Sequence, residues 1–183
     1  MEIVTGYMGK AHITAVDDAA FHTAIFGAGD FVFSTGNRLA YNIESNNLIK
    51  ILDGDIIFQG RHARIPKNIT DDCAIENGTQ GMKRHDLIVA RYKKETDGKE
   101  SVTTTVIKGT PSMEGTDPEY YTGDLFSGAT EYDMLLYRVV LSGIAIERID
   151  KLFNDMPQVR RIRSGTKLPD DAIEGDIFLL EEA

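Results

Sequence analysis

The alternation of apolar and polar positions predicts a chain built mainly from short β-strands. Large apolar residues occupy every second position from 39 to 43, and apolar runs follow at 48–52 and 55–59. The dipeptide Asp53-Gly54 separates those two runs, and glycine tolerates the positive φ angle that a tight turn between antiparallel strands requires. The pattern therefore predicts a hairpin formed by residues 48–52 and 55–59.

Two longer hairpins are indicated farther along the chain. Residues 85–93 and 101–108 are rich in β-branched and aromatic residues, which favour strands, and a charged segment joins them. Residues 134–141 and 144–149 are mainly apolar and flank a Ser-Gly turn signal at 142–143. We expect both pairs to be antiparallel, with the charged segment at a solvated tip.

A single helix is predicted near the N-terminus. Asp17 and Asp18 precede the run 19–26, and acidic side chains suit the positive end of a helix dipole. Gly27 follows the run, and glycine suits the end of a helix. Three apolar residues of this run share one helical face through i, i+3 and i+4 spacing: Phe21, Ala24 and Ile25. We expect that face to pack on a sheet.

Together these elements predict a mainly β fold of antiparallel hairpins in a sandwich-like sheet, with one short N-terminal helix and an extended C-terminal tail. Residues 1–150 are expected to form the β-rich structural domain, and residues 151–183 the C-terminal tail segment. Within the domain, residues 109–130 contain two prolines and four glycines, which indicates an ordered loop or a linker. Residues 150–154 fit one helical turn, and residues 177–180 have the pattern of a strand.

The net charge of the chain limits the classes of partner that we expect. The 183 residues include 29 acidic and 20 basic side chains, which gives a formal net charge of -9. Nucleic acids and anionic membranes attract positive charge, so we expect neither as a partner. The N-terminus does not have the pattern of a signal peptide, and the most apolar stretch, 134–146, is too short and too interrupted to insert into a membrane. The single cysteine fits a reducing compartment.

No residue pattern indicates catalysis, a cofactor or a metal site. Four histidines lack the spacing of zinc ligands: His12, His22, His62 and His85. Asp71 and Asp72 are expected to raise the pKa of the Cys73 thiol, which disfavours a nucleophilic role. An acidic group at 170–176 is a candidate cation site, but it lacks the pattern of a calcium loop, and a solvated acidic face is the simpler interpretation. Only the abundance of acids supports an enzyme such as a hydrolase of cell-wall polymer.

An aromatic pair, Tyr120-Tyr121, lies in the segment 109–130. Aromatic faces stack on sugar rings when polar side chains supply hydrogen bonds, and the sequence offers three acids nearby: Asp117, Glu119 and Asp124. The pair is therefore a candidate ligand contact. Anchoring a loop to its own domain is the commoner role of such a pair, and the sequence leaves both interpretations open.

Residues 77–92 resemble a family of tail and baseplate structural proteins from phages and prophages of Gram-positive bacteria. The match extends over about residues 1–150 in the same order, with further agreement at 4–17, 26–39, 45–60 and 107–111. Residues 164–178 are similar to short modules found near the ends of phage fibre and baseplate chains. Most of the matching residues belong to turns, and their shared order makes the resemblance specific.

The resemblance implies a virion component without catalysis, synthesised in the bacterial cytoplasm and located at the host end of the tail. It implies a homo-oligomer, with a trimer favoured, and an adaptor that links the tail hub to receptor-binding parts. A symmetric assembly needs an apolar seam, for which the candidates are Met134, Leu135, Leu136, Val139 and Leu141. The alternative is that these residues form the protomer's own core, because strongly apolar strands are usually internal. A module that binds a host-surface glycan is the alternative function.

Overall fold

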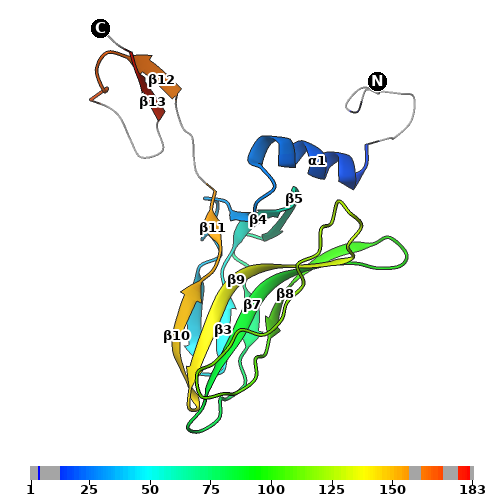
Figure 1. Cartoon of the computed structure of the whole chain (residues 1–183), viewed down its shortest axis with the longest axis vertical. Helices are drawn as coiled ribbons and strands as arrows, with labels where there is room; N and C mark the ends of the chain where they lie inside the picture. The colour runs from blue at the N-terminus through cyan, green and yellow to red at the C-terminus, as the bar shows by residue number, and fades with distance from the viewer. Residues whose placement is uncertain (1–3, 5–12, 157–161, 171–176, 182–183) are drawn as a thin grey trace.

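The computed structural model is mainly β, as predicted, and describes residues 4, 13–156, 162–170 and 177–181. Its body is an elongated arrangement of β-strands with one helix, α1 (Ala15–Phe26), lying across one end (Figure 1). Three sheets make up this body, and a separate two-stranded ribbon follows near the C-terminus.

The largest sheet contains four antiparallel strands: β7 (Lys83–Lys94), β8 (Glu100–Ile107), β9 (Glu131–Ser142) and β10 (Ala145–Lys151). Their order is β10-β9-β7-β8. The two longer hairpins predicted from the sequence are confirmed as β7–β8 and β9–β10. Strands β7 and β9 pair with each other along nearly their whole length, which joins the two hairpins into one sheet.

Two smaller sheets complete the body. One contains β2 (Tyr41–Ser45), β3 (Leu48–Ile51) and β6 (Asp71–Ala74), in the order β2-β3-β6. The other contains β1 (Phe31–Val32), β4 (Gly54–Phe58), β5 (Arg61–Ile65) and β11 (Asn154–Asp155), in the order β11-β1-β4-β5. The helical turn predicted at 150–154 is wrong, because β10 continues to Lys151 and β11 then pairs in parallel with β1.

The hairpin predicted at Asp53-Gly54 is also wrong. Strands β3 and β4 belong to different sheets, and the dipeptide forms the corner between them. The buried Asp53 carboxylate accepts a hydrogen bond from the Asn37 side-chain amide at 2.5 Å, and its backbone carbonyl accepts the N–H groups of Asn37 and Leu39. A Cβ atom at residue 54 would lie 2.8 Å from the Leu39 nitrogen, so close backbone approach explains the glycine.

The tight turn of this region lies at Gln59 and Gly60 instead. Both residues have positive φ angles, 44° and 75°, and they connect β4 to β5 in an antiparallel hairpin. Two consecutive positive φ angles match the twist of the flanking strands, which is why such turns are favoured in hairpins. We call this pair the Gln59–Gly60 turn.

The core lies between the largest sheet and the two smaller sheets. Its buried side chains come from all three, including Ile49 and Ile51 of β3, Phe58 of β4 and Ile88 of β7. The opposite face of the largest sheet, which we call its outer face, is also covered in part, because Leu87 on that face is completely buried. This burial requires a second layer over the outer face.

Helix α1 begins four residues earlier than predicted. Thr14 is its N-cap, and the Thr14 and Asp17 side chains bond each other's backbone N–H groups in a capping box. The helix ends at Gly27, which has a φ angle of 84°. The predicted apolar face does not pack on a sheet: Phe21 is 62% exposed and Ile25 is 56% exposed.

The ribbon near the C-terminus pairs β12 (Ile162–Gly165) with β13 (Ile177–Leu180) in parallel. The strand predicted at 177–180 is therefore confirmed. Leu179 and Leu180 are exposed on it. Most of the acidic group at 170–176, and His12 near the N-terminus, lie outside the described residues.

Candidate functional site

Four of the five residues proposed as an apolar seam lie in the core of the protomer. Met134, Leu136, Val139 and Leu141 are 0–1% exposed, and their side chains pack against the smaller sheets. Leu135 lies on the opposite face of β9 and is half-buried. In this structure the strand does not offer a seam to a second chain, because alternate residues of a strand point to opposite faces and this strand is covered on its apolar one.

The apolar surface that the structure does expose lies on α1. Five of the exposed apolar residues of the helix lie side by side and form what we call the outer helix face: Val16, Ala20, Phe21, Ala24 and Ile25. Ala20 and Ala24 lie one turn apart in the middle of this face, with larger side chains on both sides. The sequence periodicity identified three of these five residues, but the expectation that they pack on a sheet was wrong, because they face solvent.

The Gln59–Gly60 turn explains why the helix faces this way. The His22 Nδ1 atom lies 2.9 Å from the Gly60 carbonyl oxygen. A Cβ atom at residue 60 would overlap the Ala19 carbonyl oxygen and the Thr23 hydroxyl. The helix therefore sits directly on the turn's backbone, and only its side with small and polar residues allows so close an approach.

The segment 109–130 is an ordered loop that covers the outer face of the largest sheet. Three carboxylates anchor it. Asp86 accepts the Gly109 N–H at 2.9 Å, and Asp133 accepts the Tyr121 N–H at 2.9 Å. The third, Asp117, belongs to the loop itself. These contacts place the loop over Leu87, which accounts for its burial.

Two of these carboxylates also take part in ion pairs, one buried and one in which the Arg91 side chain is 26% exposed. Asp86 is bound through both oxygens by Arg84, at 2.8 Å each, and both side chains are 1–2% exposed. Asp133 is bound in the same way by Arg91, at 2.7 and 2.8 Å. Each carboxylate is therefore neutralised by a guanidinium group and still has a lone pair for the loop backbone.

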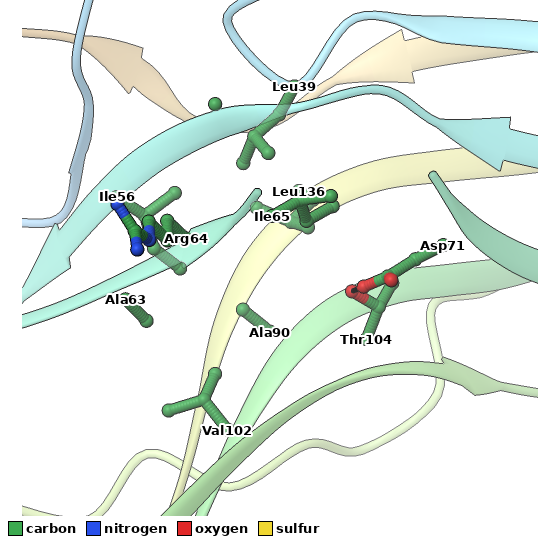
Figure 2. A pocket seen from close by; sticks show the side chains of 11 residues that line it. Leu39, Ile56, Ala63, Arg64, Ile65, Asp71, Ala90, Val102, Thr104 and Leu136 are labelled. Carbon is green, nitrogen blue, oxygen red and sulfur yellow. Dashed lines mark hydrogen bonds between the residues drawn. The ribbon is translucent and has the colours of Figure 1, made fainter. Parts of the chain in front are cut away.

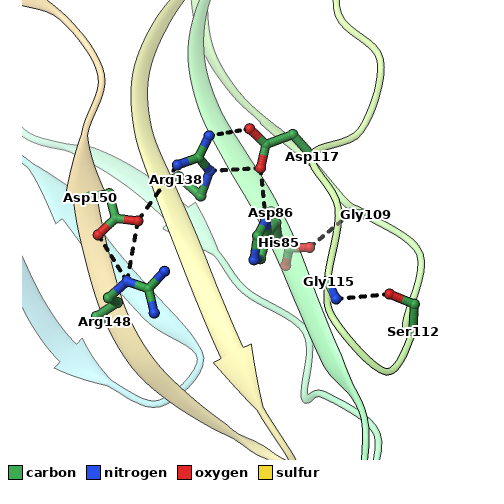
Figure 3. Close-up of polar contacts among 9 residues, drawn as sticks. All are labelled: His85, Asp86, Gly109, Ser112, Gly115, Asp117, Arg138, Arg148 and Asp150. Atoms are coloured by element: carbon green, nitrogen blue, oxygen red, sulfur yellow. Dashed lines mark hydrogen bonds and ion pairs between the residues drawn. The ribbon is translucent and has the colours of Figure 1, made fainter.

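Asp117 reaches from the loop to the polar side chains of the sheet, as Figure 3 shows. Its carboxylate is bound by the Arg138 guanidinium through two donors and by His85 Nδ1 at 2.8 Å. Arg138 also faces Asp150 at 3.7 Å, and Asp150 is bound by Arg148. The hydrogen bonds from Arg138 and then from His85 hold the pKa of the Asp117 carboxyl below its ordinary value. The cluster pins the loop to the sheet.

The structure separates the two candidate tyrosines. The Arg91 guanidinium lies over the Tyr121 ring, 4.9 Å from its centre, so Tyr121 anchors the loop. The two rings are about equally exposed, Tyr120 at 40% and Tyr121 at 43%, but Tyr120 lines a groove and Tyr121 does not. Asp117 is engaged by Arg138, and Asp124 accepts the Ser127 hydroxyl at 2.5 Å within a turn of the loop. Glu119 is exposed.

The groove beside Tyr120 has a volume of about 510 Å³. Its walls come from five parts of the chain: the turn 28–30 before β1, Gln59, the loop residues Tyr120 and Thr122, strand β9 and the segment 152–154. One partly buried polar pair of its lining joins Asp30 and Tyr132, whose hydroxyl donates to the carboxylate at 2.5 Å. Burial raises the pKa of the Asp30 carboxyl above its ordinary value, and burial together with Asp30 raises the pKa of Tyr132.

A second concavity, shown in Figure 2, lies between the β4–β5 hairpin and strands β7, β8 and β9. Apolar side chains line it, including Ile56, Ile65 and Leu136, and the Thr104 hydroxyl donates to Asp71 at 2.5 Å beside it. Its volume is about 70 Å³. Ligand pockets have volumes of roughly 300–1,000 Å³, so this space is a gap in packing rather than a ligand site.

The structure shows the surroundings of the cysteine and of a histidine that were considered as possible chemical groups in the sequence. Cys73 is buried in β6, and burial together with Asp71 and Asp72 raises the pKa of its thiol to about 12. His62 contacts Asp55 at 2.8 Å on the surface. The described part of the chain contains no group of three or more His, Cys, Asp or Glu side chains that could hold a metal ion.

Two comparisons with known proteins did not identify a relative of the chain. No protein-family model matches the chain, and a search of curated proteins found no significant match. Among the residues that the structure describes, no helix is long and apolar enough to cross a membrane.

Proposed function

We propose that the chain is a non-enzymatic structural component of a phage or prophage tail tip or baseplate, an adaptor that self-associates and links the tail hub to receptor-binding parts. The assignment to a phage tail depends on the resemblance of residues 77–92 and of the ordered stretches around them. The observation that carries self-association is the outer helix face. It replaces the β9 seam as the surface by which copies of the chain meet.

The remainder of the body supports a scaffold. Its Arg84–Asp86 and Arg91–Asp133 pairs are each bonded through two donors, its thiol is protonated at neutral pH, and its largest sheet is covered on one face and in part on the other. The large exposed side chains of α1 contrast with this closed body. Their contact with a second copy would remove apolar surface from water, which stabilises association by about 25 cal/mol per Å² buried.

The small residues in the outer helix face suit contact between helices. Ala20 and Ala24 allow two helix backbones to approach closely, and Phe21 and Ile25 can then pack beside them. The occupant we propose is α1 of another copy, in a closed ring with rotational symmetry. Leu179 and Leu180 of β13 are also exposed, one on each face of the strand, and offer apolar contacts to a different partner of the adaptor.

The test is the native mass of the purified chain by light scattering. The wild type should have a mass of about three times 20.3 kDa, and Phe21→Asp and Ile25→Asp should reduce it to 20.3 kDa. Met113→Asp is the matched control, because Met113 is an exposed apolar residue of the loop, away from α1. Thermal unfolding of each variant shows that it still folds.

Three results would count against the proposal. A wild-type protein that stays monomeric at high concentration would contradict the proposed self-association. An oligomer that survives both helix variants would remove α1 from the interface. Absence of the chain from particles released by an induced host strain, as seen by mass spectrometry, would remove the virion assignment.

A further inference from the structure

The groove beside Tyr120 has the properties of a binding site, and the adaptor role does not use it. It is lined by residues that are distant in sequence: 28–30, Gln59, Tyr120, Thr122 and 152–154, together with residues of β9. Its volume of about 510 Å³ lies within the range of sites that bind small molecules. It is formed entirely by described residues.

The floor of the groove is apolar and one wall is a free aromatic ring. Leu135, Leu152 and Phe153 line the floor. The Tyr132 ring stacks on Phe58 with centres 5.9 Å apart, and Phe153 packs edge-on against Tyr137. Both rings are therefore engaged, whereas Tyr120 keeps an exposed face. One free aromatic face is a stacking platform, not the several-sided cage that encloses an organic cation.

The polar groups of the groove suit hydroxyl ligands. One Asp30 oxygen accepts the Tyr132 hydroxyl, and within the described part of the chain the carboxylate has no ion-pair partner. The Asn154 amide and the Thr122 hydroxyl also line the groove without a partner among the described residues. Gln59 is already engaged, because its side chain bonds the backbone at Gly123 and Leu125. The groove thus offers donors and acceptors at several points around an apolar floor.

The charge of the groove excludes anionic ligands. Its lining includes two aspartates, Asp30 and Asp133, and no lysine, arginine or histidine among the described residues. Asp133 is neutralised by Arg91, which leaves Asp30 as the unpaired acid. A phosphate or carboxylate ligand would meet a negative potential and no cationic partner.

We propose that this groove binds a neutral sugar ring, with its apolar face on Tyr120 and its hydroxyl groups on Asp30, Asn154 and Thr122. This moves the glycan-binding interpretation from the pair Tyr120-Tyr121 to Tyr120 alone. The site lies on the β body and does not involve the outer helix face. Its success or failure is therefore independent of the proposed self-association.

The test is saturation-transfer NMR on the full-length protein with three neutral probes at millimolar concentration: methyl glucoside, methyl rhamnoside and N-acetylglucosamine. At least one should bind. Tyr120→Ala and Asp30→Ala should each weaken that binding about tenfold, because one removes the stacking face and the other removes a charged acceptor. Tyr120→Phe should retain most of it. Tyr121→Ala is the matched control, since that ring lies on Arg91, and should leave binding unchanged.

Several outcomes would overturn the proposal. One is no binding of any neutral probe, and another is binding that Tyr120→Ala and Asp30→Ala leave unaltered while both variants remain folded. Choline and glycerol phosphate are included as charged probes. Preferential binding of choline would make the site a cation site, and preferential binding of glycerol phosphate would contradict the charge argument.

Discussion

Helix α1 and the loop 109–130 both lie against the β body, but they do so in opposite ways. The helix turns its large apolar side chains to solvent, whereas the loop is bound by carboxylates of the largest sheet and covers part of that sheet's outer face. The difference comes from the partner surfaces. The Gln59–Gly60 turn lies against the helix side that carries Ala19 and His22, and the largest sheet offers carboxylates that accept the backbone N–H groups of the loop. Complementarity of contacting groups, not apolar content, decides which segment docks.

The strongest test of this comparison is to remove a carboxylate that anchors the loop. Asp133→Ala should lower the free energy of unfolding by about 4 kcal/mol, because it leaves the Arg91 guanidinium without its partner and the Tyr121 N–H without an acceptor. Asp133→Asn keeps an acceptor and should cost less. Urea denaturation measures both. A loss below about 1 kcal/mol for the alanine variant would show that the loop does not depend on this anchor.

A methyl group added at Gly60, where α1 contacts the turn, should have the next largest effect on stability. Gly60→Ala should destabilise the protein by about 3 kcal/mol or detach α1, because the residue has a φ angle of 75° and its Cβ atom would overlap the Ala19 carbonyl oxygen. Hydrogen exchange of the α1 amides distinguishes detachment from global unfolding.

Gly98→Ala is the control that separates the effect of the positive φ angle from the effect of the steric overlap with α1. Gly98 has a φ angle of 87°, but nothing lies within 4 Å of its Cβ position. It should therefore show only the conformational penalty, about 1 kcal/mol. Equal losses for Gly60→Ala and Gly98→Ala would mean that the helix does not sit tightly on the turn.

The smallest effect concerns the dependence of the loop anchor on pH. The pKa of Asp117 is lowered in the folded protein by Arg138 and His85, so the stability that this carboxylate contributes is present above its unfolded pKa of about 3.9 and is lost as the pH falls through its folded value. Its partly exposed position limits the contribution to less than about 1 kcal/mol. The difference in unfolding free energy between wild type and Asp117→Asn should be constant from neutral pH to about pH 4 and should shrink below it. A difference that changes at neutral pH instead would contradict this assignment.

The sequence predicted individual strands and hairpins better than it predicted which elements pack against one another. The β7–β8 and β9–β10 hairpins follow from strand-forming residues next to turn signals, and these are short-range properties. The dipeptide Asp53-Gly54 has the same local signal, but a corner between two sheets uses it, because the glycine allows contact with Leu39. A turn signal reports what the backbone can adopt, and long-range packing selects between a hairpin and a corner.

For the candidate site too, the local sequence did not show which residues lie together in the folded protein. The apolar run on β9 is real, but only the paired structure shows that it faces the core. Tyr120 and Tyr121 look equivalent in the sequence, and the position of Arg91 on β7 makes one an anchor and leaves the other in a groove. Asp30 is joined to Tyr132 across 102 residues, so no local pattern could have paired them.

The Gln59–Gly60 turn also has a consequence for the order of folding. Its Gln59 side chain bonds loop residues 64 and 66 positions away, and its Gly60 carbonyl meets His22 from 38 positions away. A hairpin closes within roughly 1–10 μs, whereas contacts at such separations form later because longer loops must close first. We therefore expect the closed Gln59–Gly60 turn to form before the helix and the loop dock. Slowing the closure of that single turn delays both docking steps together.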